Sequence, residues 1–243
     1  MAADSEDILG RVVRKLGRFA QLDETDRQAI QALPARIETH VAGIVLAKDG
    51  ARATHCTFLI DGFACRHKET RDGTRQIVSF HLPGDVLDLQ NLYLHRNDSA
   101  LQTLSPATVA RVAAEDLRAL AAERPRIAEA LWRDSLIDAA ITREWVVNVG
   151  RRSAMSRIAH LLCEYAARRE MAGYGPSERF DLPMTQEQIG DATGLTSVHV
   201  NRKLHELEDM GVIARERRDL HIRDRARLKR IGDFDPAYLH IPN

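Results

Sequence analysis

The sequence predicts an α+β protein: an N-terminal antiparallel β-barrel or jelly roll, a long helix, and a C-terminal winged helix-turn-helix. Three observations predict it. Short alternating apolar runs fill residues 36–113, a helical periodicity follows Pro125, and two short helices joined by a tight turn occupy residues 184–210. The chain has 243 residues, so one large or two small domains are expected, and a hydrophobic content of 44% is enough for true cores. The net charge is zero, which argues against a polybasic surface.

Residues 1–124 are expected to form the first domain. Residues 5–32 show apolar positions at helical spacing, and Pro34 ends that segment. The alternating runs that follow are Ile37–Leu46, Thr54–Arg66, Arg75–His81, Val86–Leu89, Ala100–Leu104 and Thr108–Val112. The turns between them are Asp49-Gly50, Asp61-Gly62, Asp72-Gly73 and Pro83-Gly84-Asp85. Asp-Gly pairs between apolar runs are typical of hairpins, which indicates a small barrel.

After a short helix over residues 115–123, Pro125 can open a helix that runs to about Val149, roughly 37 Å at 1.5 Å per residue. Its apolar stripe is Ile127, Leu131, Ile137, Ile141 and Trp145, which Asp134 and Asp138 interrupt. A helix of this length exceeds what a small barrel can cover. We therefore predict that residues 125–150 pair with a second copy in a homodimer, the alternative being a core helix within one chain.

Residues 151–243 are expected to form the second domain. A helix should cover residues 153–171, a loop 173–176, and a last short helix 224–231, with the tail 235–240 packing back on the surface. Within this domain, Thr185 can cap a helix with Gln188 in a capping box, and Gly194 permits a sharp exit. Thr196 or Ser197 then caps a second helix. The inward positions of the two helices are Ile189, Ala192, Leu195, Val200, Leu204, Leu207 and Met210.

The outward face of the second helix carries the chemistry of a DNA reader. It presents Ser197, Val198, His199, Asn201, Arg202 and Lys203. Arginine can bind guanine bidentately, asparagine can bind adenine, and a helix N-terminus favours phosphate. Strands near Ile213 and Ile222 enclose Arg217 and Arg218, a basic hairpin suited to phosphate contacts. We predict double-stranded DNA as the partner; the alternative is an ordinary helical hairpin with a solvated face.

Other function classes are disfavoured. The N-terminal ten residues are acidic and lack the apolar segment of a secretory signal, and no apolar run is long enough for a membrane span. Cys56, Cys65 and Cys163 are odd in number and lack metal-ligand spacing, so we expect a cytoplasmic protein with no disulfides and no metal. Cys56 and Cys65 alternate with apolar neighbours on predicted strands, so these two are expected to be buried thiols and not redox sensors. The sequence lacks a phosphate-binding loop with its lysine, a G-x-S-x-G elbow and an H-E-x-x-H helix, so no enzyme is predicted.

The chain resembles the Crp/Fnr family of bacterial transcription regulators over nearly its whole length. The resemblance is carried by Leu59-Ile60-Asp61-Gly62 and Leu82-Pro83-Gly84-Asp85 in the barrel, by Arg157-Ile158-Ala159 after the long helix, and by residues 182–190 and 195–202. It implies a homodimer that binds pseudo-palindromic promoter sites, recruits RNA polymerase and responds to a small ligand or redox signal.

The resemblance implies a ligand site at Gly84, Asp85, Arg96, Ser99 and Thr142. Members that bind cyclic AMP carry an Arg-Ser pair that neutralises the phosphate. Here the pair reads Asp98-Ser99, which argues against cyclic AMP, although His95 and Arg96 lie close. The absence of cysteine before Cys56 argues against an iron–sulfur cluster, and His55, His67, His81 and His95 are interpreted as surface or core residues and not as haem ligands. The effector is left open: a ligand other than cyclic AMP, or none.

The reading helix departs from the family pattern of Glu, then Ser or Gly three positions on, then Arg. Here the series is Val198, Asn201, Arg202, so Val198 is predicted to contact a thymine methyl and Arg202 a guanine, giving an altered half-site. Asn201 could read adenine or bind a phosphate. Thr185, Gln186 and Ser197 are expected to bind phosphates. The hairpin lacks a tip glycine, and Arg218-Asp219 is expected at its turn. The rival function is a nucleotide-binding regulatory module of an enzyme or channel.

Overall fold

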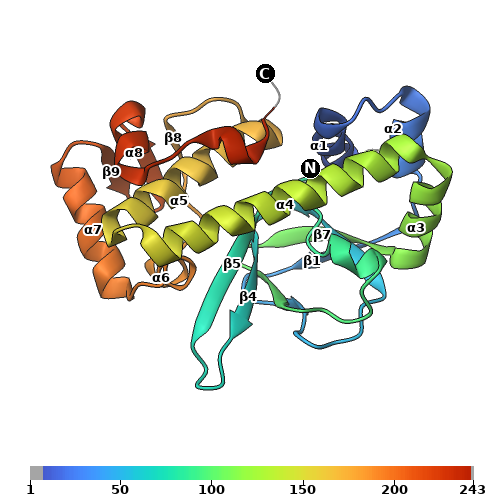
Figure 1. Cartoon of the computed structure of the whole chain (residues 1–243), viewed down its shortest axis with the longest axis horizontal. Helices are drawn as coiled ribbons and strands as arrows, with labels where there is room; N and C mark the ends of the chain where they lie inside the picture. The colour runs from blue at the N-terminus through green and yellow to red at the C-terminus, as the bar shows by residue number, and fades with distance from the viewer. Residues whose placement is uncertain (1–7, 242–243) are drawn as a thin grey trace. The chain divides into compact units, whose positions relative to one another are not determined.

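The computed structural model describes residues 8–241 and divides them into two compact units (Figure 1). The first unit holds the residues up to Lys68 together with Ser79–Ala139, and the second holds Glu69–Val78 together with Ala140–Ile241. The first residues of the predicted N-terminal helix, 5–7, lie outside the described part. No helix within residues 8–241 combines the length and apolar character that a bilayer crossing requires.

The first unit begins with two helices, α1 (Gly10–Phe19) and α2 (Glu24–Gln31). Helix α1 buries Val12, Leu16 and Phe19, the apolar positions that predicted it. Helix α2 starts at Asp23, whose carboxylate accepts from the backbone N–H of Asp26 while the Asp26 side chain accepts in return. This reciprocal cap satisfies two N–H groups that would otherwise lack partners.

Two antiparallel sheets follow, as the alternating runs predict. One has the order β1-β7-β3, from β1 (Ala35–His40), β7 (Ala107–Ala113) and β3 (His55–Asp61). The other has the order β2-β6-β4-β5, from β2 (Val45–Ala47), β6 (Ala100–Thr103), β4 (Ala64–Glu69) and β5 (Arg75–His81). Glycines 50, 62, 73 and 84 all take the positive φ that their predicted turns need.

One predicted strand is wrong. Residues 86–89 contribute only an isolated bridge between Val86 and Phe58, and the chain then enters the short helix η1 (Leu89–Leu92). In a strand with one buried face, Val86 and Leu87 would point to opposite sides, one of them to solvent, but both are buried. Leu87 belongs to the core between the two sheets, with Leu46, Leu59, Leu101 and Val109.

Helices α3 (Ala114–Glu123) and α4 (Pro125–Arg151) follow the barrel. Helix α4 has 27 residues, is continuous through Gly150, and contributes to both units. The helix therefore runs past Val149, its predicted end, since a single glycine costs only about 1 kcal/mol in a helix interior.

The predicted apolar stripe of α4 does not form a free face. Ile127 and Leu131 are buried in the first unit's core, while Ile141 and Trp145 are buried in the second unit. This part of the helix follows the packed-core alternative.

The second unit contains α5 (Ala154–Arg169), a short π-helical turn η2 (Glu170–Tyr174), α6 (Gln186–Thr193) and α7 (Ser197–Asp209). Its sheet has the order β8-β10-β9, from β8 (Arg179–Asp181), β10 (Asp219–Ile222) and β9 (Ile213–Glu216). Strand β8 lies after the predicted loop 173–176, in a segment for which no strand was predicted. Helix α8 (Arg225–Gly232) and the turn η3 (Pro236–Leu239) end the unit.

A buried carboxylate ties the start of this unit to its end. Glu164 on α5 accepts hydrogen bonds from the Trp145 indole N–H at 2.9 and 3.1 Å and from the Tyr238 hydroxyl at 2.8 Å. His160 lies 3.1 Å from both the Tyr238 hydroxyl and the Gly232 carbonyl oxygen. The tail therefore does pack back on the unit, and it is anchored there by hydrogen bonds as well as by buried Leu239.

Gly190 on α6 provides a test of how closely α6 packs against the turn that leads to α7. A Cβ there would lie 2.4 Å from the Leu195 carbonyl oxygen, whereas a Cβ at Gly150 on α4 would meet nothing within 4 Å. We expect Gly190→Ala to lower the free energy of unfolding by about 1–3 kcal/mol because the turn must shift. The matched Gly150→Ala should raise it by about 0.5–1 kcal/mol. Urea unfolding of both variants measures the difference; equal effects would contradict this account of the turn.

Candidate nucleic-acid interface

Helices α6 and α7 form the predicted helix-turn-helix. Thr185 caps α6: its hydroxyl accepts from the Gln188 N–H at 3.2 Å, and the Gln188 side chain accepts from the Thr185 N–H at 2.9 Å. Gly194 ends α6 with φ 66° and ψ 38°, the left-handed conformation that glycine tolerates. Thr196, the first of the two predicted candidates, caps α7 by accepting from the His199 N–H. Local sequence chemistry thus determines the turn between the helices.

The inward face of α7 anchors it on the unit. Val200, Leu204 and Leu207 are at most 1% exposed. Met210 follows the helix end and is 36% exposed, so its predicted burial is wrong. The helix ends at Asp209 before Met210 can continue the buried stripe.

The outward face of α7 is open from its first residue. Ser197, Val198 and His199 are exposed, Val198 to 77%, and Arg202 is exposed one turn further on. A valine this exposed contributes nothing to the core, so its side chain is available to a partner. The first turn of α7 therefore presents a hydroxyl, a methyl pair and an imidazole around the free N–H groups of the helix start.

Asn201 and Gln186 form a contact that the sequence analysis missed. The Gln186 amide donates to the Asn201 side-chain oxygen at 3.0 Å, joining the start of α6 to the face of α7. Both residues are half-buried. Because the Asn201 oxygen accepts this bond, Gln186 restrains the orientation of the Asn201 amide group.

Glu206 organises the cations of this face. It accepts from the Lys203 ammonium at 2.7 and 2.8 Å and lies 3.9 Å from Arg202 Nε. Lys203 is largely covered, with 21% of its side chain exposed, whereas Arg202 keeps 61%. Arg202 is consequently the more available of the two cations predicted on this face.

The basic hairpin is formed by β9 and β10, with Arg217 and Arg218 exposed at its turn. The predicted turn at Arg218-Asp219 is wrong by one residue, because Asp219 pairs with Glu216 in the ladder. Arg217 takes φ 56° without being glycine, which is how the chain turns without a tip glycine. The Leu182 N–H donates to the Arg218 carbonyl at 2.7 Å and holds the turn against the segment before α6.

The five residues of the expected ligand site are not equivalent. Asp85 is buried, accepts from the Leu82 N–H at 2.9 Å, and pairs with Lys15 Nζ at 2.9 Å. Ser99 is buried and donates to Asp98. Arg96 is exposed, donates to the Gly50 carbonyl, and lines a recess of about 280 Å³ with Arg52 and His95.

The remaining two expected ligand residues lie on different units. Gly84 has φ 100°, and a Cβ there would lie 3.1 Å from the Arg11 carbonyl oxygen on α1. Thr142 is exposed on the part of α4 that belongs to the second unit. Gly84 therefore serves a close approach between α1 and the 82–85 turn.

Asp88 is a buried carboxylate that the sequence analysis did not assign to the site. It is 3% exposed and accepts from the Thr57 hydroxyl at 3.0 Å and the Asn91 amide at 3.1 Å. Burial raises the pKa of Asp88 to about 6, against the opposing hydrogen bonds from Thr57. The sequence gives no signal for its burial, since a single aspartate three residues after the Pro83-Gly84-Asp85 turn was interpreted as an ordinary strand residue.

The three cysteines are buried free thiols, which confirms the prediction for Cys56 and Cys65 and adds Cys163. Burial raises the pKa of Cys56 and of Cys163 well above the ordinary thiol value. Thiols held protonated in this way are poor nucleophiles and metal ligands. Within the described part of the chain, no group of three or more His, Cys, Asp or Glu residues could hold a metal ion.

Comparison with known proteins agrees with this architecture. Residues 38–124 match a family model described as a cyclic nucleotide-binding domain, and residues 156–231 match one described as a Crp-like helix-turn-helix domain. The transcriptional activator protein FnrL of Cereibacter sphaeroides is 30% identical over 84% of this chain and 83% of its own length. The chain belongs to the Crp/Fnr family of transcription regulators.

Two further members are similar over most of their length. The nitrogen fixation regulation protein FixK of Bradyrhizobium diazoefficiens is 29% identical over 90% of this chain and 91% of its own. The structure of FixK2 from Bradyrhizobium japonicum superposes with a TM-score of 0.76 at 27% identity, over 84% of this chain and all of that one. FixK is by name a nitrogen fixation regulation protein and FnrL a transcriptional activator protein, and the helix-turn-helix model matches residues 156–231 of this chain.

The raised pKa of Asp88 predicts a pH dependence of stability. The folded carboxyl holds its proton up to about pH 6, whereas an unfolded aspartate releases it near 3.9. The folded state therefore binds the extra proton between these values, and stability falls as pH rises through 6. From pH 5 to 7.5, the unfolding free energy of the wild type relative to Asp88→Asn should fall by about 1 kcal/mol. A pH-independent difference in urea unfolding would contradict the assignment.

Proposed function

We propose that this Crp/Fnr family member is a sequence-specific DNA-binding transcription regulator that acts as a homodimer on pseudo-palindromic promoter sites and recruits RNA polymerase in the cytoplasm. The observation that carries the proposal is the open N-terminal face of α7, where Val198, His199 and Arg202 are exposed on a helix whose opposite side is buried. This is the arrangement that lets a recognition helix enter a major groove. The domain boundaries that we propose are residues 1–124, 125–150 and 151–243.

The exposed face of α4 supports the homodimer. The helix buries its predicted stripe yet leaves Trp132, Leu136, Val146 and Val147 between 45% and 66% exposed. From Trp132 the positions 136, 139, 143 and 146 continue at alternating steps of four and three, the spacing of a two-helix seam. Ala139 is small enough for close approach, and Arg143 is exposed on the same line. A second copy of the helix covers such a face by the same residues on both sides.

Base reading and phosphate binding are assigned to different residues. Arg202 is proposed to bind guanine, Val198 to contact a thymine methyl, and Asn201 to read adenine in the orientation that Gln186 fixes. Thr185, Gln186 and Ser197 are proposed to bind phosphates at the helix starts, and Arg217 and Arg218 do so from the hairpin turn. His199 and Lys203 complete the face. Substituting Val198 for the glutamate of the usual pattern gives a half-site altered at that base pair.

Substituting Arg202 separates reading from phosphate binding. Arg202→Ala should weaken binding to a selected site by about 1–3 kcal/mol and relax the preference at one base pair, whereas Arg218→Ala should weaken binding to all sequences equally and lower the salt dependence. Selection of binding sites from random genomic fragments, followed by fluorescence anisotropy at several salt concentrations, measures both effects. A uniform loss with Arg202→Ala would remove it from base reading, and no DNA binding by the wild type would refute the function.

The dimer face is tested by a charge placed on it. Val146→Glu, at a position 66% exposed on α4, should shift the protein toward monomer because two buried carboxylates would meet across the seam. Val41→Glu makes the same change at a position 68% exposed outside α4 and should leave the association unchanged. Sedimentation velocity over a concentration series gives the dimer dissociation constant. Equal dissociation constants for the two variants would exclude this face as the seam.

A further inference from the structure

Two acidic residues on α4 are each held by a cation from another element of the first unit. Asp134 and Asp138 are one helical turn apart and so lie on one side of α4. Lys15 on α1 lies 2.6 Å from Asp134, and Arg66 on β4 donates to Asp138 at 3.1 Å. The sequence treats both aspartates as interruptions of an apolar stripe. The structure gives them partners instead.

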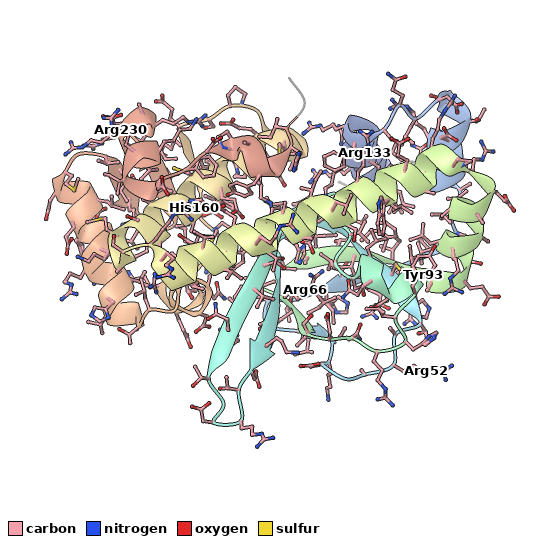
Figure 2. All side chains as sticks on the ribbon, in the orientation of Figure 1. Arg52, Arg66, Tyr93, Arg133, His160 and Arg230 are labelled. Atoms are coloured by element: carbon pink, nitrogen blue, oxygen red, sulfur yellow. The ribbon has the colours of Figure 1, made fainter. Side chains whose placement is uncertain are left out.

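Each of these cations also binds the segment 82–88. Lys15 Nζ lies 2.9 Å from Asp85 Oδ1, so one ammonium joins Asp85 to Asp134. Arg66 donates through its other terminal nitrogen to the Leu87 carbonyl at 2.6 Å, so one guanidinium joins Leu87 to Asp138. Figure 2 shows Arg66 on β4 below the long helix, where its side chain reaches α4. The segment 82–88 is therefore fastened to α4 twice, by the chain's own charges.

The surroundings make these contacts strong. The side chains of Asp134, Asp85 and Arg66 are 8%, 11% and 13% exposed, and that of Lys15 is 24% exposed. Burial alone disfavours the charged lysine, but the two carboxylates outweigh it, and the pKa of Lys15 stays above its ordinary value. The close fit of Gly84 against the Arg11 carbonyl keeps α1 beside the 82–85 turn, where Lys15 is needed. Removing either partner of such a pair would leave a charge stranded in a covered site.

An effector can control α4 only by binding one arrangement of the helix and the barrel better than another. A ligand would do so by contacting the barrel and the helix at once. Lys15 and Arg66 make both contacts with side chains of the chain itself. When α4 is held in one arrangement, few molecules occupy the arrangements that do not bind DNA. The measured DNA affinity is then close to that of the binding arrangement itself.

We propose that Lys15 and Arg66 take the place of an effector: by bridging the segment 82–88 to Asp134 and Asp138, they hold α4 in the DNA-binding arrangement, and the protein needs no small molecule. Both are positioning residues that act on DNA through α4. The inference rests on the proposed function, because its readout is DNA affinity. It resolves the choice between a ligand other than cyclic AMP and constitutive activity in favour of the second.

The test uses purified full-length protein freed of small molecules by refolding or extensive dialysis, and a duplex selected by the wild type. The wild type should bind this duplex tightly, and cyclic AMP or cyclic GMP at millimolar concentration should change its dissociation constant by less than about twofold. Arg66→Met and Asp138→Asn should each weaken binding by about tenfold or more. Arg71→Met removes the same charge at an exposed position of the neighbouring turn and should have no effect.

Two further measurements separate positioning from general damage. Arg66→Lys keeps the charge and should retain more affinity than Arg66→Met, and hydrogen exchange should quicken in residues 125–139 of Arg66→Met while α7 keeps its protection. If Arg66→Met does not fold, Asp138→Asn tests the bridge from its half-exposed side. Unchanged DNA affinity in Arg66→Met or Asp138→Asn overturns the proposal. So does a tenfold gain of the wild type with a cyclic nucleotide. Failure of the wild type to bind any duplex instead refutes the proposed function.

Discussion

Helix α4 imposes the constraint on which the other elements depend, because it has to meet three environments with one 27-residue sequence. One side packs into the cores through Ile127, Leu131, Ile141 and Trp145. The same side carries Asp134 and Asp138 at the same helical spacing, and their charges need cations. A second side leaves Trp132, Leu136 and Val146 exposed. A helix with two acids inside its buried side and apolar residues on another side is stable only where each group has its own partner.

A buried acid that depends on donors from other elements also occurs in the second unit. The Glu164 carboxylate is buried, and its hydrogen bonds come from Trp145 on α4 and from Tyr238 in the tail. A buried carboxylate that loses its donors costs more than the bonds themselves contribute. The last residues of α4, helix α5 and the tail must therefore be in place together. The end of α4, helix α5 and the tail are thus joined through the single carboxylate of Glu164.

The proposed DNA-binding face, on the outward side of α7, is organised by polar contacts among its own side chains. Gln186 holds the Asn201 oxygen and Glu206 holds Lys203, whereas Arg202 and Val198 remain accessible. Side chains restrained before binding lose less conformational entropy when a base or phosphate arrives. In the proposed interface, this division between restrained and accessible side chains assigns base reading to a few positions. Because the chain's net charge is zero, the proposal takes affinity from the two faces of a homodimer acting together.

Sequence patterns were enough to predict the elements whose signals are local, because propensities and caps act within a few residues. These elements are the caps at Thr185 and Thr196, the turn at Gly194, the Asp-Gly turns of the barrel and the period of α7. Long-range packing sets the features that the patterns did not predict: the apolar stripe of α4 is buried within the chain, residues 86–89 form no strand, and Asp134, Asp138 and Asn201 have their partners on other elements. These depend on residues far apart in the chain. Lys15 is remote from Asp134 in sequence, and no periodicity links them until the fold places α1 beside α4.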